Sequence, residues 1–187
     1  MPLEIEAKIK VDSFDAVRAR LVELGAERLC RVLETNRILD TADRRLLSSG
    51  RGLRIRTCEG EGTVPPATLT YKGPQQAGAL KVREELETGL DDPAAAIAIL
   101  GGLGFEPALV FQKRRETWRL PEVTIELDEL PRLGCYVEIE GPDEPAVTRT
   151  QTALGLAAEP LIRTSYIALL IDHARANGLP HDRVVFG

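Results

Sequence analysis

The sequence predicts an α+β protein in which eight antiparallel strands close into a barrel and amphipathic helices pack against its outside. Several segments alternate between apolar and charged residues, and this period of two is typical of strands with one buried face. The segments between them combine helix-capping residues with apolar residues at helical spacing. Because 187 residues, 43% of them hydrophobic, can build one core, we expect a single domain over residues 1–187, with its core at about 3–170 and a C-terminal tail at 177–187.

The N-terminal segment gives the clearest strand signal. Residues 3–11 alternate strictly between apolar and charged side chains, and the charged face consists of Glu4, Glu6, Lys8 and Lys10. A helix is expected next, because Asp12-Ser13 can cap its start and Gly25 can end it.

Seven further segments predict strands and three predict helices. The predicted strands are 34–40, 53–56, 68–72, 80–87, 110–119, 123–128 and 135–140. The alternation is weakest in the strand at 34–40. Caps and stop signals place the helices at about 91–101, 146–155 and 160–176. Residues 59–66 contain two glycines and two prolines, so we expect a mobile hairpin loop there.

The charged faces of these strands form unusually dense ionisable rows that include all five lysines of the chain. An ordinary half-buried sheet would turn such faces to water, with the apolar faces inside the barrel. That arrangement would leave the helices without an apolar surface to pack on, so we expect the charged rows to line a hydrated lumen. The rows hold the acids Glu4, Glu6, Glu85, Glu87, Glu126, Asp128, Glu138 and Glu140, and the bases Lys8, Lys10, Lys72, Lys81, Lys113, Arg54, Arg56, Arg83, Arg115 and Arg119.

The residue types in these rows indicate a metal and a polyanion. Glu4 and Glu6, like Glu138 and Glu140, lie two residues apart, which separates them by about 6.5–7 Å along a strand. Carboxylates at that spacing can share Mg²⁺ or Mn²⁺. Arginine and lysine suit phosphate oxygens, and so many cations suit a triphosphate with about four negative charges.

The same residues resemble the CYTH family, also known as triphosphate tunnel metalloenzymes. The N-terminal signature Glu4-x-Glu6-x-Lys8 is followed, in the order of the family, by the segments 53–56, 69–74, 83–87, 113–115, 126–128 and 134–140. The resemblance covers about residues 3–170 and implies an eight-stranded tunnel that binds triphosphate along its axis. Ile9 departs from the aromatic residue often found after the signature lysine, and the loop at 59–66 differs in length from many relatives.

The resemblance also implies roles for individual residues. Lys8, Glu85 and Lys113 are expected to be catalytic, with Glu85 orienting basic side chains. Ser165-Tyr166 and the apolar residues after them resemble the C-terminal helix of the family, which is expected either to pack on the barrel wall or to contact the substrate as a lid. The expected metal ligands are Glu4, Glu6, Asp128, Glu138 and Glu140, and the expected phosphate-binding residues are Lys8, Arg54, Arg56, Lys72, Arg83, Lys113 and Arg115.

Three functions remain open from the sequence. A Mg²⁺- or Mn²⁺-dependent triphosphatase would hydrolyse tripolyphosphate, thiamine triphosphate or a nucleoside triphosphate. A class IV adenylyl cyclase would convert ATP to cyclic AMP and pyrophosphate, but adenine recognition has little aromatic support, because only Tyr136 is expected to point inward while Tyr71 and Trp118 point outward. A non-enzymatic polyphosphate or nucleotide binder is disfavoured, because capture alone needs no complete carboxylate set.

Composition excludes several other classes. The formal charge of −5 argues against nucleic-acid binding, and the absence of about 18 consecutive apolar residues argues against a membrane span. A cytoplasmic protein with three reduced cysteines is expected, with a homodimer as one open arrangement. His173 and His181 are not expected to be ligands, and residues 47–53 lack the lysine of a P-loop.

Overall fold

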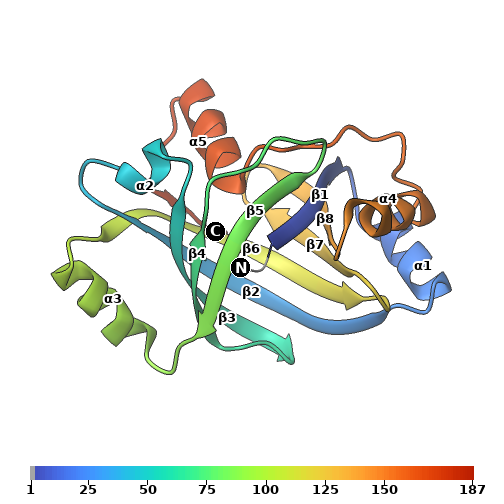
Figure 1. Cartoon of the computed structure of the whole chain (residues 1–187), viewed down its shortest axis with the longest axis horizontal. Coiled ribbons are helices and arrows are strands. Elements are labelled where there is room, and N and C mark those ends of the chain that lie inside the picture. Colours follow the sequence, from blue (N-terminus) through green and yellow to red (C-terminus); the bar gives the residue numbers. More distant parts are fainter. Residues whose placement is uncertain (1–2) are drawn as a thin grey trace.

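The structure is a computed structural model that describes residues 3–187. Within this range the chain forms nine strands and five helices, arranged as a barrel with helices around it (Figure 1). The strands are β1 Leu3–Val11, β2 Glu27–Asp40, β3 Gly52–Gly62, β4 Ala67–Lys72, β5 Lys81–Gly89, β6 Glu106–Arg119, β7 Thr124–Leu130, β8 Gly134–Glu140 and β9 Arg183–Val184. The helices are α1 Asp15–Glu23, α2 Arg45–Ser48, α3 Pro93–Gly102, α4 Glu144–Ala153 and α5 Tyr166–Ala176.

Eight of the strands close into an antiparallel barrel, as the sequence predicts. Their order is β2-β3-β4-β5-β1-β8-β7-β6, and β6 pairs back with β2 to complete the ring. In β1 the register sets Glu4 opposite Arg83 and Lys8 opposite Glu138, so charged residues of neighbouring strands share one face. The two-residue strand β9 adds to β6 in parallel.

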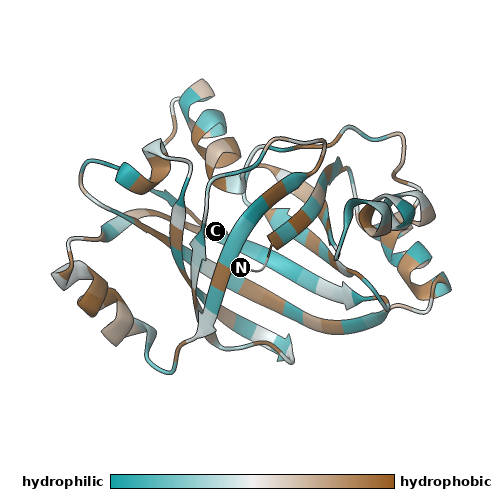
Figure 2. Ribbon diagram, viewed as in Figure 1, coloured by the Kyte–Doolittle hydropathy of each residue, from teal (hydrophilic) through white to brown (hydrophobic). Residues whose placement is uncertain are grey.

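The apolar faces of β1, β7 and β8 point outward and lie under helices. Ile9, Val137 and Ile139 are fully buried in a core cluster that also contains Leu21 of α1 and Val147 of α4. Figure 2 shows the resulting alternation of hydrophilic and hydrophobic positions along the strands. The expectation that the charged rows face inward is therefore confirmed for this part of the barrel.

A second apolar cluster covers one stretch of the inner wall. Phe111, Leu130 and Tyr136 share the inward face of their strands, and Tyr166 and Leu170 of α5 pack against them. These buried residues form an apolar section of the inner wall next to the charged lumen. The N-terminus of α5 is thus held inside the barrel wall and does not merely lie on its outside.

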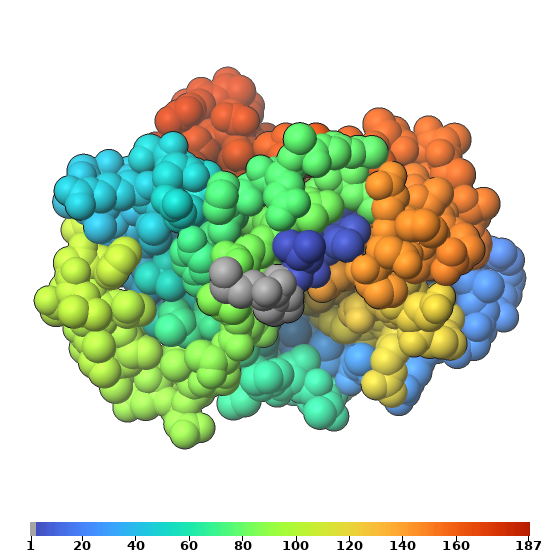
Figure 3. Space-filling model, viewed as in Figure 1, coloured from blue at the N-terminus to red at the C-terminus, as the bar shows by residue number. Residues whose placement is uncertain are grey.

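The space-filling view shows which segments form one face of the molecule (Figure 3). The loop and strand around β5 occupy the centre of this face, and the start of β1 is visible between them and α4. None of the helices in the described residues is long and apolar enough to cross a membrane. Cys30, Cys58 and Cys135 are all free thiols.

Several predicted boundaries are wrong, and each error has a local cause. The helix expected from residue 160 begins at Tyr166, because the preceding segment is extended: Leu161 bridges to Ile9, and the Ile162 amide donates to the Lys8 carbonyl at 2.8 Å. The helix expected directly after a cap at Asp12-Ser13 begins at Asp15, and its N-cap is Phe14, which makes no side-chain capping hydrogen bond. The loop expected over 59–66 is shorter, since β3 continues to Gly62, and the strand expected over 34–40 begins at Glu27.

The helix α3 forms where its capping signal predicts it, and α4 begins two residues before its predicted start. The Asp92 carboxylate accepts a hydrogen bond from the Ala95 amide at 2.9 Å, and the Asp143 carboxylate accepts one from the Ala146 amide at 2.8 Å. Both helices carry proline in their first turn, where its missing amide hydrogen costs nothing.

Candidate active site in the barrel

A cavity of about 960 Å³ occupies the inside of the barrel. Its lining includes side chains from all eight barrel strands and from the first turn of α5. The charged residues of the predicted rows that line it are Glu4, Glu6, Lys8, Arg54, Arg56, Lys72, Lys81, Arg83, Glu85, Glu87, Lys113, Arg115, Glu126, Glu138 and Glu140.

Three members of the predicted rows do not line the cavity. Lys10 is exposed near the end of β1, and Arg119 is exposed at the end of β6, where it pairs with Glu27 at 2.6 Å. Both expectations were wrong because side-chain alternation continues where a strand leaves the barrel, although the lumen does not. Asp128 has no exposed surface and lies behind the lining, hydrogen-bonded to Lys113 and Arg115.

One half of the lumen holds a network that we name the buried cluster. Its ammonium and carboxylate groups are directly paired: Lys113 Nζ lies 3.0 Å from Asp128, and Lys8 Nζ lies 3.2 Å from Glu138. The Arg115 guanidinium lies 2.8 Å from Glu138 and also pairs with Asp128. The buried cluster consists of Lys8, Glu34, Lys113, Arg115, Asp128 and Glu138.

The charges of the buried cluster fix its protonation. Burial works against ionised Glu34 and Glu138, but the neighbouring cations outweigh it. Lys113 and Arg115 hold the pKa of Glu34 well below its usual range, and Lys8 and Lys113 do the same for Glu138. Both carboxylates are therefore ionised at neutral pH.

Glu126 lies beside the buried cluster and behaves differently. Burial, together with the charges of Asp128 and Glu138, raises the pKa of Glu126 to about 8, although Arg115 pairs with it. Because burial is the main cause of this raised pKa, an additional cation at the Glu126 carboxylate would favour its ionised form.

The opposite part of the lumen is built by β3, β4 and β5, and we name it the β3–β5 wall. Lys72 Nζ donates to Glu4 at 2.8 Å and also pairs with Glu85. The Arg56 guanidinium lies 3.1 Å from Glu87 and 3.2 Å from Glu34, so it links this wall to the buried cluster. The β3–β5 wall consists of Arg54, Arg56, Lys72, Glu85 and Glu87, all of them partly exposed in the cavity.

A group of acids lies at the edge where β1 meets β8. Glu6 is opposite Glu140 in the register, and Lys81 donates to Glu6. Burial and the Glu138 charge raise the pKa of Glu6. Although Glu140 is exposed as a residue, its carboxyl lines the cavity, where partial burial and the charges of Glu4 and Glu6 raise its pKa to about 7.

Arg83 lines the cavity but is held by backbone groups. Its guanidinium donates to the Gly73 carbonyl at 3.0 Å and to the Gly50 carbonyl at 3.1 Å. Arg83 thereby joins the segment before β3 to the loop between β4 and β5 at the edge of the lumen.

Comparison with known proteins agrees with this geometry. The sequence model of the CYTH domain matches residues 2–166. The chain belongs to the CYTH family. A relative from Methanocaldococcus jannaschii, described as a putative adenylate cyclase, is 27% identical over 176 residues, which cover 89% of this chain and 98% of the relative.

Solved structures of similar proteins share the barrel of this CYTH chain. The PH1819 protein of Pyrococcus horikoshii is 29% identical with a TM-score of 0.77, over 90% of this chain and 98% of that one. A Hippeastrum protein, described as a putative adenylyl cyclase with a dominant triphosphatase activity, has a TM-score of 0.67 over 96% of this chain and 97% of its own. At 20% identity this second likeness concerns the fold alone.

The donor set of the CYTH barrel fits a hard divalent cation. Carboxylate oxygens of Glu126, Asp128 and Glu138 lie within 4.8 Å of one another, and we name these three residues the carboxylate trio. Mg²⁺ and Mn²⁺ prefer such all-oxygen ligands. Among the predicted metal ligands, Asp128 and Glu138 belong to the carboxylate trio, whereas Glu4, Glu6 and Glu140 lie together at the β1–β8 edge.

Two functional candidates were missed or left undecided from the sequence. Glu34 pairs with Lys113 and Arg56, but the alternation in its segment is too irregular to reveal its inward direction. The sequence signal that could have indicated it is the polar pair Glu34 and Asn36, two residues apart on one face of the strand, and the structure buries both side chains. Tyr166 lines the cavity, so the start of the C-terminal helix reaches the lumen, as the lid alternative expects, and does not only pack on the outer wall.

The other residues considered from the sequence lie where they were expected. Tyr136 points inward and its ring lies 5.3 Å from that of Tyr166, whereas Trp118 belongs to the outer core cluster. His173 is in the last turn of α5, and His181 is exposed beyond it.

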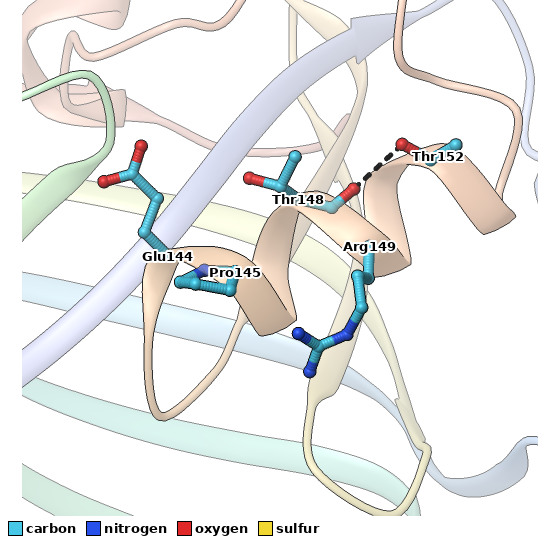
Figure 4. A pocket seen from close by; sticks show the side chains of 5 residues that line it. All are labelled: Glu144, Pro145, Thr148, Arg149 and Thr152. Atoms are coloured by element: carbon cyan, nitrogen blue, oxygen red, sulfur yellow. Dashed lines mark hydrogen bonds between the residues drawn. The ribbon is translucent and has the colours of Figure 1, made fainter.

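A second hollow lies outside the barrel, along α4 (Figure 4). Thr148 and Thr152 contribute to it, and the Thr152 hydroxyl donates to the Thr148 carbonyl at 3.0 Å, so the helix itself satisfies this polar group. Arg149 pairs with Glu122 at 3.1 Å on the surface. Glu144 and Arg149 are its only charged lining residues within the described chain, so this hollow offers no cluster comparable with the lumen.

Proposed function

We propose that the protein is a divalent-metal-dependent triphosphatase that binds its substrate inside the barrel. The observation on which the proposal depends is the shared wall: cations from every part of the lumen line one cavity of about 960 Å³ together with Glu126 and Glu138 of the carboxylate trio, and Asp128 lies directly behind them. A triphosphate supplies the negative charge that these cations can neutralise, and a metal supplies the positive charge that the carboxylates lack.

The residues of the lumen divide the work of binding. Arg54, Arg56 and Lys72 are partly exposed in the cavity, so they can exchange their carboxylate partners for phosphate oxygens at modest cost. Lys8 and Lys113 lie deeper and are held in place by Glu138 and Asp128. We assign to these two lysines, oriented in this way, the stabilisation of charge that develops on a phosphoryl group. Glu85 orients Lys72, and Arg83 holds the edge of the site.

The metal ligands follow from the positions of the acids. Asp128 and Glu138, together with Glu126, would hold one Mg²⁺ or Mn²⁺, and Glu4, Glu6 and Glu140 form a second candidate group. When bound, the ion supplies Lewis-acid stabilisation of charge on phosphate oxygens.

An adenylyl cyclase is the second candidate. The name of the relative from Methanocaldococcus jannaschii supports it, and so does an apolar part of the cavity formed by Ile38, Phe111 and Ile167, which could contact a purine base. In this reaction the ribose 3′-hydroxyl would attack the α-phosphorus and pyrophosphate would leave. The triphosphatase is preferred because no aromatic side chain beyond Phe111 and Tyr166 lines the described cavity.

A substrate panel separates these functions. The purified protein is incubated with Mg²⁺ or Mn²⁺ and with tripolyphosphate, thiamine triphosphate or ATP, while released phosphate and cyclic AMP are both measured. Phosphate release that stops in excess chelator supports the triphosphatase. Formation of cyclic AMP with equimolar pyrophosphate would instead identify an adenylyl cyclase. No turnover of any of the three substrates would favour a binding protein. We place the activity in the cytoplasm, where the three free thiols would stay reduced.

A further inference from the structure

Tyr166 occupies an unusual position at the start of α5. Ser165 caps the helix by accepting a hydrogen bond from the Ala168 amide at 3.3 Å, and Tyr166 follows as the first helical residue. The cap fixes the direction in which the chain enters the helix, which places the Tyr166 ring inside the cavity.

The ring of Tyr166 lies against two cations of the buried cluster. Lys8 Nζ is 4.1 Å from the ring centroid, and Lys113 Nζ is 5.5 Å from it. Lys8 Nζ also donates to the Thr164 carbonyl at 3.2 Å. The segment that enters α5 thus holds Lys8 through both a carbonyl and an aromatic face.

The hydroxyl of Tyr166 has no hydrogen-bond partner among the described residues, although it is buried. A buried hydroxyl without a partner costs free energy, so native proteins retain few of them without a reason. Arg54 Nε is a second unpartnered donor in the same cavity. Because both residues line the same cationic cavity, their unused donors indicate that the cavity binds hydrogen-bond acceptors, and phosphate oxygens are such acceptors.

We propose that Tyr166 is a substrate-binding residue: its hydroxyl donates a hydrogen bond to a phosphate oxygen of the polyphosphate chain, and its ring positions the ammonium groups of Lys8 and Lys113 around the same phosphate. This inference rests on the proposed function, because it requires a polyphosphate in the lumen.

The surroundings of the hydroxyl keep it a donor. Burial and the charges of Glu138 and Asp128 raise the pKa of Tyr166 well above its usual range, so the hydroxyl keeps its proton across the physiological range. Those carboxylates lie beyond hydrogen-bond distance, which leaves the proton available for a ligand.

The test compares three variants in equilibrium binding of tripolyphosphate, measured by calorimetry in excess chelator so that metal-dependent turnover does not interfere. Tyr166→Phe keeps the ring over the lysines and removes only the hydroxyl. Tyr166→Leu removes both. Tyr71→Phe removes a hydroxyl from a tyrosine that does not line the lumen and is the matched control.

We expect Tyr166→Phe to weaken tripolyphosphate binding about tenfold, the effect of losing one hydrogen bond to a charged acceptor. Its melting temperature should equal or exceed that of the wild type, since an unpartnered buried hydroxyl is removed. Tyr166→Leu should bind more weakly still, and Tyr71→Phe should bind like the wild type.

Wild-type affinity in Tyr166→Phe would overturn this inference while the proposed function stands. A lower melting temperature with unchanged affinity would also overturn it, because the hydroxyl would then have only a structural role. If the wild type itself does not bind tripolyphosphate, the proposed function fails first and this inference fails with it. Should Tyr166→Leu not fold, Tyr166→Phe alone decides.

Discussion

The two halves of the lumen differ in their contact with water. In the buried cluster, the exposed fraction of the side chains runs from 0% at Asp128 to 9% at Glu138. In the β3–β5 wall, the exposed fraction of the side chains runs from 15% at Arg56 to 34% at Glu87. Both halves use the same residue types, so the difference comes from their surroundings: α5 and its apolar cluster cover the first half, and solvent reaches the second.

This difference suits the two tasks that the proposed function requires of one lumen. Charges removed from water interact strongly and keep a fixed geometry, but they are costly to leave unpaired. Charges that remain hydrated exchange partners readily and contribute little to stability. We therefore assign orientation of the reacting phosphate to the buried cluster, and capture and release of the polyanion to the β3–β5 wall.

The largest effect is expected from Glu138→Gln, in the buried half. The amide keeps the shape of the side chain and can still accept a hydrogen bond from Lys8, so the fold should persist. Because the substitution removes a charge from the carboxylate trio, we expect kcat for triphosphate hydrolysis to fall by about 10³-fold. Steady-state kinetics and circular dichroism provide the two measurements.

Glu4→Gln should likewise abolish turnover, through the acids at the β1–β8 edge. Glu122→Gln is the control, because Glu122 pairs only with Arg149 on the outer surface. Full activity in both Glu138→Gln and Glu4→Gln would contradict the assignment of the site.

A matched pair of lysine variants tests the comparison directly. Lys113→Met removes a buried cation shared by Asp128 and Glu34, which keep only their arginine partners, and we expect the free energy of unfolding to drop by about 3 kcal/mol. Lys72→Met removes an equally well-paired lysine from the β3–β5 wall, where water can replace it, and should cost no more than about 1 kcal/mol. Urea unfolding of both variants gives the two values, and equal losses would refute the distinction between the halves.

The barrel could be predicted from the sequence because a strict physical rule produces the pattern. Side chains on a strand alternate between faces, and one face of each strand must meet helices, so a charged row such as that of β1 has only one consistent direction. The same rule could not say where the lumen ends along a strand, and for this reason Lys10 and Arg119 were wrongly placed in it.

The missed parts of the site depend on contacts that no local pattern reveals. Glu34 lies in a strand whose two faces both mix polar and apolar residues, so its direction is set by pairing with β3 and β6. The inward position of Tyr166 follows from the extended segment before α5, which pairs with β1 across more than 150 residues of sequence.

The β3–β5 wall should govern substrate capture. Arg54→Gln removes one hydrated cation, and we expect KM for tripolyphosphate to rise about tenfold while kcat changes little. The melting temperature should stay within a few degrees of the wild type, because the partner Glu87 can be solvated. A fall in kcat with unchanged KM would assign Arg54 to the chemical step instead.

The smallest expected effect is a pH dependence of stability. With a pKa of about 8, Glu126 keeps its proton in the folded chain between pH 4.5 and 8, whereas the unfolded chain releases it. The folded state then binds more protons, so the free energy of unfolding should fall as pH rises through this window, by on the order of 1 kcal/mol for each pH unit. Glu34 and Glu138, whose pKa values are lowered, are ionised in both states there and do not change this slope, whereas Glu6 and Glu140, whose pKa values are raised, add to it with the same sign.

Thermal melts of the metal-free protein between pH 5.5 and 8.5 measure this slope. Glu126→Gln should reduce it, and Glu122→Gln should leave it unchanged. A melting temperature that rises with pH over this range would show that Glu126 is not the dominant titrating group.

The central claim is that one hydrated lumen binds a polyphosphate and a divalent metal together. A crystal structure of the protein with tripolyphosphate and Mn²⁺ tests it most directly. The account predicts phosphate density between Arg54 and Lys113 and an anomalous manganese peak at carboxylates of the lumen. Clear density for both ligands on the outer surface, with the lumen filled by water alone, would contradict it.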